Sequence, residues 1–395
     1  MLNLTELSDV SISIDTIEMY DVELPMRSEW ITSHSSQHVR QLVLIALRSG
    51  ETVGWGECCA TELPTYVEEY LAGERAVLRS RWIPELLEGQ YPTVASLARG
   101  GLPHRNHFAR SCVEMAMLDL VAQMHRQSLP QTLGITSTST PAGVAVGIHP
   151  SIDSLLGEVS SYVDLGYRRV KAKVDRDCCV EVASAIRGAF PSLLLGLDAN
   201  GVFEPSDTPA LVTLDQLDLA FIEQPYGVHQ PPEVLRELSN RISTPLCLDE
   251  SLRSVADIEQ WTANGMTVAN LKPSRVGGIT RMVDMAQRCR DLGLGAWIGG
   301  MVESGLGRTV NAALAELPGI TMPGDLSGSD RFFVTDLLGN PPQVIDGQVL
   351  LSSELGLGYR IDPDSLARFT VQHESFDETG PNCPPLSPRQ RRRTD

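Results

Sequence analysis

The sequence predicts an α/β barrel, a modified (β/α)7–8 TIM-like barrel, with an α+β domain in front of it. Charged residues that recur at a nearly constant interval predict the barrel. Lys173, Asp198, Glu223, Asp249 and Lys272 are separated by 25, 25, 26 and 23 residues. Such an interval fits one strand, one helix and two short loops, so each βα repeat places one charged residue.

The first part of the chain predicts the α+β domain. From Val10 to about Gly56, apolar and polar residues alternate in strand-like runs, which indicates an antiparallel meander. From Tyr66 to about Gln127, apolar residues recur at three and four positions, which indicates helices. Strands followed by helices are typical of an α+β domain. The Ser/Thr/Pro-rich run GITSTSTPAG is then expected to link this domain to the repeats.

Each recurring charge lies at the end of a predicted strand. Ahead of Lys173, apolar residues alternate with Arg169 and Lys171, so Lys171 and Lys173 are expected to project from one face. The other charged residues end or follow the apolar runs in SLLLGLDAN, LAFIEQP, TPLCLDES and TVANLKP. Glycine or proline comes soon after most of them, which places the charges at the carboxyl ends of strands. In a (β/α)8 barrel that face carries the chemistry.

The chain is long enough for more than a barrel. Its 395 residues leave room for a second domain. The expected division is an α+β domain at 1–140, a barrel at 141–340, a segment at 341–378 that packs back on the first domain, and a disordered tail at 379–395. The tail runs from a Pro-rich stretch into RQRRRTD, which is typical of an unfolded terminus.

Composition argues against several classes of protein. The net charge of -18 disfavours nucleic acid as a partner, because phosphate binding needs a basic surface. No apolar run approaches the ~20 residues of a membrane span, and the N-terminus lacks the order of a signal peptide. The eight cysteines show no zinc or disulfide spacing. We expect a cytoplasmic protein with no membrane partner, and we also expect it to form a homo-oligomer.

Three carboxylates predict a metal site. Asp198, Glu223 and Asp249 end successive strands, so their side chains are expected to converge on one small volume. Carboxylates that close repel one another unless a cation neutralises them. A hard divalent ion that keeps open positions for water and substrate favours Mg²⁺ over Ca²⁺, with Mn²⁺ able to replace it. The alternative is that these acids are helix N-caps or surface ion pairs.

Two lysines predict acid/base chemistry beside that metal. Lys173 and Lys272 flank the carboxylate strands and are expected to face each other across the metal. A lysine acts as a base at neutral pH only if its pKa falls, which burial and neighbouring positive charge can cause. One lysine would take the α-proton of a bound carboxylate, and the other would return a proton on the opposite face of the enediolate. The alternative is a lysine whose ammonium group reaches solvent.

The motifs KAK, LDAN, IEQP, LDES and LKPSRVGG, in this order, resemble the enolase superfamily, in its muconate-lactonising subgroup. GWGECCA, PTYVEEY and IGGMVESGLGRTVNAALAELPGITMPGDLSGSDRFF are similar to the o-succinylbenzoate synthase and N-acylamino acid racemase family. The resemblance covers roughly residues 12 to 370. It implies that the N-terminal domain caps the barrel and that loops of this domain choose the substrate.

The resemblance also implies a role for each matching position. The metal ligands correspond to Asp198, Glu223 and Asp249, and the acid/base pair corresponds to Lys173 and Lys272. The positions that correspond to contacts with the substrate are Lys171, which would assist the substrate carboxylate, Asn200, Gly300 and Met301. Arg275 resembles an arginine associated with racemase members of the family, although a surface ion pair at a helix start is an equally good interpretation of this residue.

The chain departs from the family pattern where the pocket is expected. His34, in the loop WITSHSSQ, stands where an aromatic apolar residue is usual, Thr61 replaces a usual methionine, and Ala145 replaces a common serine. We expect His34 and Thr61 to contact the substrate. The charged residues at the strand ends therefore match the family pattern, while the residues expected to line the pocket differ from it. This difference suits a more polar or differently shaped substrate.

Together these features predict Mg²⁺-dependent abstraction of the α-proton from a small-molecule carboxylate. The resemblance favours an N-acyl amino acid racemase or epimerase, with N-succinyl amino acids among the candidate substrates. A dehydratase of the o-succinylbenzoate synthase type in menaquinone synthesis and a cycloisomerase share the same first step. A Schiff-base aldolase would also use a strand-end lysine but would not need three carboxylates. A catalytically silent binding homologue would normally have lost a ligand or a base.

Overall fold

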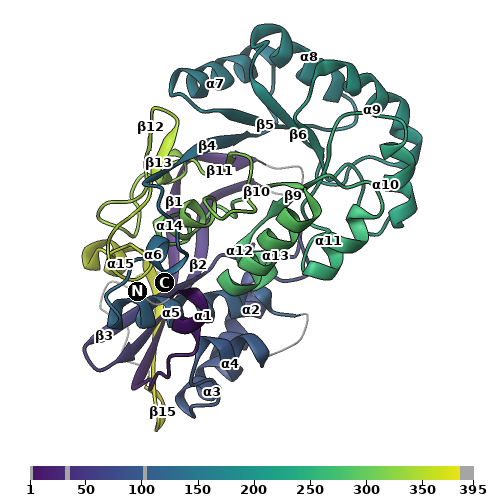
Figure 1. Cartoon of the computed structure of the whole chain (residues 1–395). Helices are drawn as coiled ribbons and strands as arrows, with labels where there is room; N and C mark the ends of the chain where they lie inside the picture. Colours follow the sequence, from purple (N-terminus) through teal and green to yellow (C-terminus); the bar gives the residue numbers. More distant parts are fainter. Residues whose placement is uncertain (1–2, 32–35, 101–104, 383–395) are drawn as a thin grey trace.

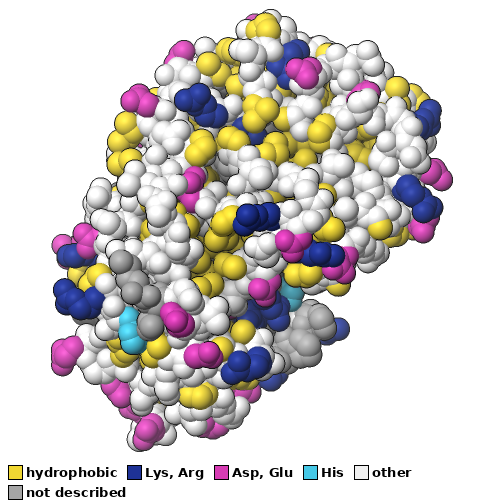
Figure 2. Space-filling view, viewed as in Figure 1, with side chains coloured by type: hydrophobic (Ala, Val, Ile, Leu, Met, Phe, Trp, Pro, Cys, Tyr) yellow, Lys and Arg dark blue, Asp and Glu magenta, His cyan; other side chains and the backbone are white. Residues whose placement is uncertain are grey.

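The structure is a computed structural model of the whole chain, and it describes residues 3–31, 36–100 and 105–382. Figure 1 shows two parts that lie side by side. The N-terminal residues form a sheet with helices packed against it, and the following residues form a ring of strands with helices around it. Figure 2 shows basic and acidic side chains interspersed on one face of the molecule. No helix in the described residues is long and apolar enough to cross a membrane.

The N-terminal layer, called the cap below, is built on an antiparallel sheet. Its first three strands are β1 (Thr16–Ile31), β2 (Ser36–Ser49) and β3 (Thr52–Cys58), and they pair in sequence order. The predicted meander is therefore present, but β1 begins later than expected. The residues ahead of it include a short helix that sequence patterns did not indicate, α1 (Leu4–Ser8), which begins with a capping box from Asn3.

Helices cover one face of the cap sheet. They are α2 (Leu71–Val77), η1 (Leu78–Trp82), α3 (Ile83–Leu87), α4 (Val94–Arg99), α5 (His107–Met124) and α6 (Leu129–Thr132). The buried helix α5 packs directly on β3, and two glycines make this approach possible. A Cβ atom on Gly54 would lie 2.2 Å from the carbonyl oxygen of Ala116, and one on Gly56 would lie 2.0 Å from that of Cys112. The GWG sequence therefore sets the spacing between sheet and helix.

The barrel has eight parallel strands, and the last of them pairs with the first. The strands are β4 (Ser139–Val146), β5 (Arg169–Lys173), β6 (Leu194–Asp198), β7 (Phe221–Glu223), β8 (Leu246–Leu248), β9 (Val268–Leu271), β10 (Gly295–Ile298) and β11 (Gly324–Asp325). β4 begins inside the run GITSTSTPAG, which the sequence suggested to be a link. The predicted modified barrel is confirmed.

Helices connect successive barrel strands and lie on the outside of the ring (Figure 1). They are α7 (Ile152–Asp164), α8 (Cys179–Ala189), η2 (Pro205–Asp207), α9 (Thr208–Leu214), η3 (Asp215–Leu217), α10 (Pro232–Ser239), α11 (Val255–Thr262), α12 (Pro273–Val276), α13 (Ile279–Leu292) and α14 (Gly305–Leu314), and η4 (Ser329–Arg331) follows β11. With this connectivity all strand carboxyl ends face the cap side of the ring.

The C-terminal segment returns across both parts of the molecule. Its elements are β12 (Val344–Ile345), β13 (Gln348–Leu350), α15 (Pro363–Phe369), β14 (Thr370–Asp377) and β15 (Gly380–Asn382). β14 pairs antiparallel with β1 of the cap sheet. β13 instead pairs with β4 of the barrel. The expected disordered tail includes β15, and its remainder, 383–395, lies outside the described residues.

A buried ion pair supports the contact between the cap and the barrel. Arg110 and Glu114 on α5 are 1% and 0% exposed, and Arg110 Nη1 lies 2.9 Å from Glu114 Oε2. The backbone N–H of Thr280, in the first turn of α13, donates to Glu114 Oε1 at 2.6 Å. This carboxylate thus accepts a hydrogen bond from the positive end of a barrel helix while neutralising a buried arginine.

Replacing Glu114 with alanine is expected to destabilise the protein by about 3–5 kcal/mol, because the substitution leaves the Arg110 charge buried without its partner. Urea unfolding measures this loss. Glu354→Ala is the control, since it removes an exposed ion pair with Arg360 and should cost under about 1 kcal/mol. Equal losses in the two variants would show that the α5 pair does not stabilise the fold.

Candidate active site

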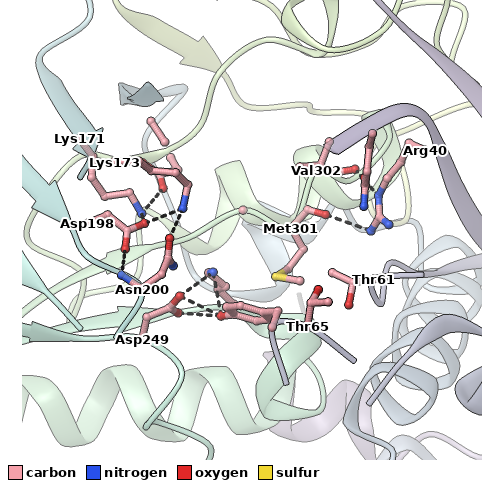
Figure 3. Close-up of a pocket in the computed structure, with 16 residues that line it drawn as sticks. Arg40, Thr61, Thr65, Lys171, Lys173, Asp198, Asn200, Asp249, Met301 and Val302 are labelled. Atoms are coloured by element: carbon pink, nitrogen blue, oxygen red, sulfur yellow. Dashed lines mark hydrogen bonds and ion pairs between the residues drawn. The ribbon is translucent and has the colours of Figure 1, made fainter. Parts of the chain in front are cut away.

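The recurring charges surround one cavity of about 140 Å³ between the strand ends of the barrel and the cap. Figure 3 shows the barrel side chains on one side, Arg40 and Thr61 of the cap on the other, and Met301 between them. The sequence-predicted residues that line the cavity are Thr61, Lys171, Lys173, Asp198, Asn200, Asp249, Lys272, Gly300 and Met301. Glu223 and Arg275 are buried beside it, and His34 lies outside the described residues.

Lys171 stands at the centre of the acidic side of the cavity. Its Nζ lies 3.1 Å from Asp198 Oδ2, 2.9 Å from Glu223 Oε2 and 3.1 Å from Asp325 Oδ2. Burial disfavours the ammonium ion, but the surrounding carboxylates outweigh it and raise the pKa of Lys171 well above its ordinary value. Lys171 is therefore a permanent cation, suited to holding an anionic group and not to removing a proton.

Lys173 projects from the same face of β5, as its alternation with Lys171 predicted. Its Nζ lies 3.1 Å from Asp198 Oδ2 and donates a short hydrogen bond to Asn200 Oδ1. Asn200 follows β6 in the left-handed region, with φ 44°, a conformation that asparagine tolerates better than most residues. Its amide donates to Glu250 Oε1 at 3.1 Å, which fixes the orientation of the amide oxygen toward Lys173.

Lys272 belongs to a second cluster on another side of the cavity. Its Nζ lies 2.9 Å from Asp249 Oδ2 and donates to Tyr66 Oη at 2.8 Å. Arg275 Nη1 also contacts Asp249 Oδ1, and Tyr66 Oη donates to the same carboxylate at 2.9 Å. Burial opposes ionisation of Asp249, but Arg275 and Lys272 lower its pKa. Arg275 is 1% exposed, so its pair with Asp249 is buried and is not a surface ion pair.

Glu223 is the most deeply buried of the three predicted ligands. It is 0% exposed, and Asn270 Nδ2 donates to its Oε1 at 2.7 Å. Burial and then the negative charge of Asp198 raise the pKa of Glu223 to about 8, although Lys171 acts in the opposite direction. Burial and the neighbouring carboxylate therefore both disfavour the ionised form of Glu223.

The three carboxylates suit a divalent cation by their chemistry. They are buried oxygen donors at the ends of adjacent strands, and Asp198 lies opposite Glu223 in the β6–β7 register. In the described residues, no three His, Cys, Asp or Glu side chains are grouped closely enough to hold one metal ion. Each acid is instead turned toward a cationic side chain. Their carboxylate oxygens are nevertheless the kind of donor that Mg²⁺ prefers in proteins.

The turn after β10 forms the wall between barrel and cap. Gly300, Met301 and Val302 line the cavity, and Val302 has φ 56°, a left-handed conformation that is strained for a β-branched residue. Such a residue costs on the order of 1–3 kcal/mol and persists only where its surroundings hold it. Arg40 on β2 supplies contacts that do so, since it donates to the carbonyl oxygens of Met301 and Val302 at 3.1 and 3.2 Å.

Sequence patterns did not single out three residues that take part in this site. Tyr66 and Arg40 come from the cap, so no barrel periodicity could mark them. Asp325 lies at the end of β11, two intervals after Lys272, because the strand between them, β10, ends at Ile298 without a charged residue. Tyr66 does occur in PTYVEEY, one of the motifs that carried the family resemblance. The resemblance of that motif to the family was therefore the available signal for Tyr66.

Known families match both parts of this chain. Residues 15–134 match the family described as the mandelate racemase / muconate lactonizing enzyme N-terminal domain. Residues 155–365 match the family described as enolase C-terminal domain-like. The first match covers most of the cap, and the second covers the barrel strands that carry the charged residues.

Three relatives illustrate the similarity. An N-succinylamino acid racemase from Amycolatopsis is 38% identical over 367 residues, which cover 91% of this chain and 98% of that protein. An o-succinylbenzoate synthase from Bacillus subtilis is 33% identical over 377 residues, which cover 93% of this chain and 100% of that protein. A crystal structure of an enolase superfamily member from Listeria innocua gives a TM-score of 0.89 at 32% identity. The match covers 93% of this chain and 99% of the Listeria chain. The similarity spans the cap and the barrel together.

Proposed function

The chain belongs to the mandelate racemase / muconate lactonizing enzyme family of the enolase superfamily, and from this premise we propose that it racemises or epimerises N-acyl amino acids, in particular N-succinyl amino acids. The resemblance seen in the sequence motifs is thereby confirmed, and the chain is an enzyme. The observation that carries the proposal is that Lys173 and Lys272 line one cavity from two separate clusters. Acid/base groups on two sides of one carbon allow a proton to leave from one face and another to be delivered to the opposite face.

The proposed metal site consists of Asp198, Glu223 and Asp249. When bound there, Mg²⁺ would act as a Lewis acid on the substrate carboxylate and stabilise the negative charge that develops as the α-proton leaves. The buried Lys171 ammonium group supports this role, because its fixed positive charge favours an anionic substrate. These residues bind and orient the carboxylate end of the substrate.

The proton is proposed to move between the substrate and two lysines. Lys173 Nζ would accept the α-proton from one face of the carbon, and Lys272 Nζ would deliver a proton to the other face, with the roles reversed for the opposite enantiomer. The hydrogen bond to Asn200 orients Lys173, and Tyr66 with Asp249 orients Lys272. Each amine is held by neighbours on its own side of the cavity, which supports two independent acid/base groups.

The second candidate is o-succinylbenzoate synthase activity. It is favoured by the Bacillus subtilis relative of that name, because the match covers the whole length of that relative. The dehydration begins with the same α-proton abstraction, so the lysines and carboxylates above serve either reaction. Thr61 and Ala145, which depart from the usual family residues, both line the cavity and would be where the two substrates are distinguished.

A substrate panel tests the proposal. The purified protein would be assayed with Mg²⁺ on both enantiomers of several N-acyl amino acids and on the cyclohexadiene acid that yields o-succinylbenzoate. The proposal expects optical rotation to decay for N-succinyl amino acids with a higher kcat/KM than for any other substrate in the panel. Turnover of the cyclohexadiene acid with inert N-acyl amino acids would overturn racemisation and establish the dehydratase.

A further inference from the structure

Arg40 makes an unusual set of contacts for a buried arginine. It lies on β2 of the cap, is 2% exposed and lines the cavity. Its guanidinium group donates to four backbone carbonyl oxygens. Two of them, in Cys59 and Ala60, follow β3 of the cap, and two, in Met301 and Val302, follow β10 of the barrel. One side chain therefore joins two segments that lie far apart in sequence, and Figure 3 shows its bonds to Met301 and Val302.

The turn after β10 is also held by the neighbouring cap strand. Ser304 donates to Glu57 on β3 through its backbone N–H, at 3.1 Å, and through its hydroxyl group. β2 and β3 are adjacent strands, with Val43 opposite Cys58. The cap sheet thus contacts both ends of the stretch from Met301 to Ser304. Within that stretch the left-handed Val302 is the position least able to keep its conformation without support.

We propose that Arg40 is a positioning residue for substrate binding, which locks the Gly300–Val302 turn against the cap and so completes the wall of the active-site cavity. The proposal rests on the function proposed above. Arg40 acts through the backbone of the turn, and the catalytic lysines have their own partners elsewhere. Loss of Arg40 should therefore raise KM much more than it lowers kcat. It should also free the turn in the absence of any substrate.

Two substitutions of Arg40 test the first part of this proposal. Arg40→Met removes all four hydrogen bonds, and Arg40→Lys keeps the charge but cannot reach the carbonyls of both segments at once. Amide hydrogen exchange in residues 299–304 should become at least about tenfold faster in either variant without substrate. KM for N-succinyl amino acids should rise about tenfold, while kcat changes by less than about threefold. If Arg40→Met fails to fold, the hydrogen exchange and the KM of Arg40→Lys test the same prediction.

Arg253→Met is the matched control. Arg253 also joins barrel to cap, through an ion pair with Glu68 at 2.7 Å, but it does not line the cavity. This variant should leave both hydrogen exchange at 299–304 and KM as in the wild type. Equal effects of Arg253→Met and Arg40→Met would show a general loosening of the cap, and would overturn a specific role for Arg40.

A second substitution separates positioning from simple destabilisation. Glycine adopts φ 56° without strain, so Val302→Gly should let the turn keep its shape with less help from Arg40. The increase in KM caused by Arg40→Met should then be several-fold smaller in the Val302→Gly background. An unchanged increase overturns the proposal. Amide hydrogen exchange measures the mobility of the turn without any substrate. The Arg40 proposal can therefore fail or hold independently of the racemase assignment.

Discussion

Replacing Lys272 with alanine is expected to lower the racemisation rate by about 10⁴-fold, the upper range for loss of a general acid/base group. The reason is that Lys272 Nζ lies in a cluster with Asp249 and Tyr66, apart from the cluster of Lys173 and Asn200, so Lys173 cannot take its place. Chiral chromatography of N-succinyl amino acids, started from either enantiomer, measures the loss. The substitution should leave the fold intact, because Arg275 still contacts the buried carboxylate of Asp249 and neutralises it.

The control for this variant is Lys272→Arg, which keeps a cation beside Asp249 but offers no group that can be deprotonated near neutral pH. It should be as inactive as Lys272→Ala. If either variant racemises within tenfold of the wild-type rate, Lys272 is not one of the two bases. Near-normal activity in Lys272→Arg alone would show that its positive charge, and not proton transfer, is what the reaction needs.

Replacing Glu223 with glutamine is expected to abolish turnover and to weaken Mg²⁺ binding by more than about 100-fold, since even residues outside the ligand set typically contribute 10–100-fold. Glutamine keeps the shape and the possible contact with Asn270 but removes the charge. Turnover should fall by about 10³-fold or more, because Lewis-acid stabilisation is worth several kcal/mol. Calorimetric titration with Mg²⁺ and the racemisation assay measure the two effects.

Glu74→Gln is the matched control for the metal prediction. Glu74 is also buried, at 1% exposure, and burial raises its pKa to about 7, but it lies in the cap away from the cavity. Its substitution should leave Mg²⁺ affinity unchanged. Activity that survives both chelation and Glu223→Gln would remove the metal from the mechanism altogether.

The barrel and most of its charged ring could be predicted from the sequence because one physical rule governs both. A strand followed by a helix uses a nearly fixed number of residues, so side chains at strand ends recur at a fixed interval. The rule located Lys173, Asp198, Asp249 and Lys272, which the structure places around one cavity. It also placed Glu223, although this residue turned out to lie behind Lys171 and not on the cavity wall.

Residues contributed by the cap could not be predicted in the same way. Tyr66 and Arg40 reach the site only because the cap packs over the strand ends, through contacts between residues 206 and 261 positions apart in sequence. No periodicity encodes such a contact. The role of Arg275 was equally ambiguous, because a surface pair at a helix start and a buried bond to Asp249 give the same local pattern. In each case burial and the identity of the partner decided the role.

The stereochemistry of α-proton exchange in deuterated water, in Lys173→Ala and Lys272→Ala, tests the two-base account most directly. The account predicts that each variant, with Mg²⁺, still incorporates deuterium into one enantiomer of an N-succinyl amino acid, and that the two variants act on opposite enantiomers. Exchange of the same enantiomer by both variants, or of both enantiomers by either one, would contradict it.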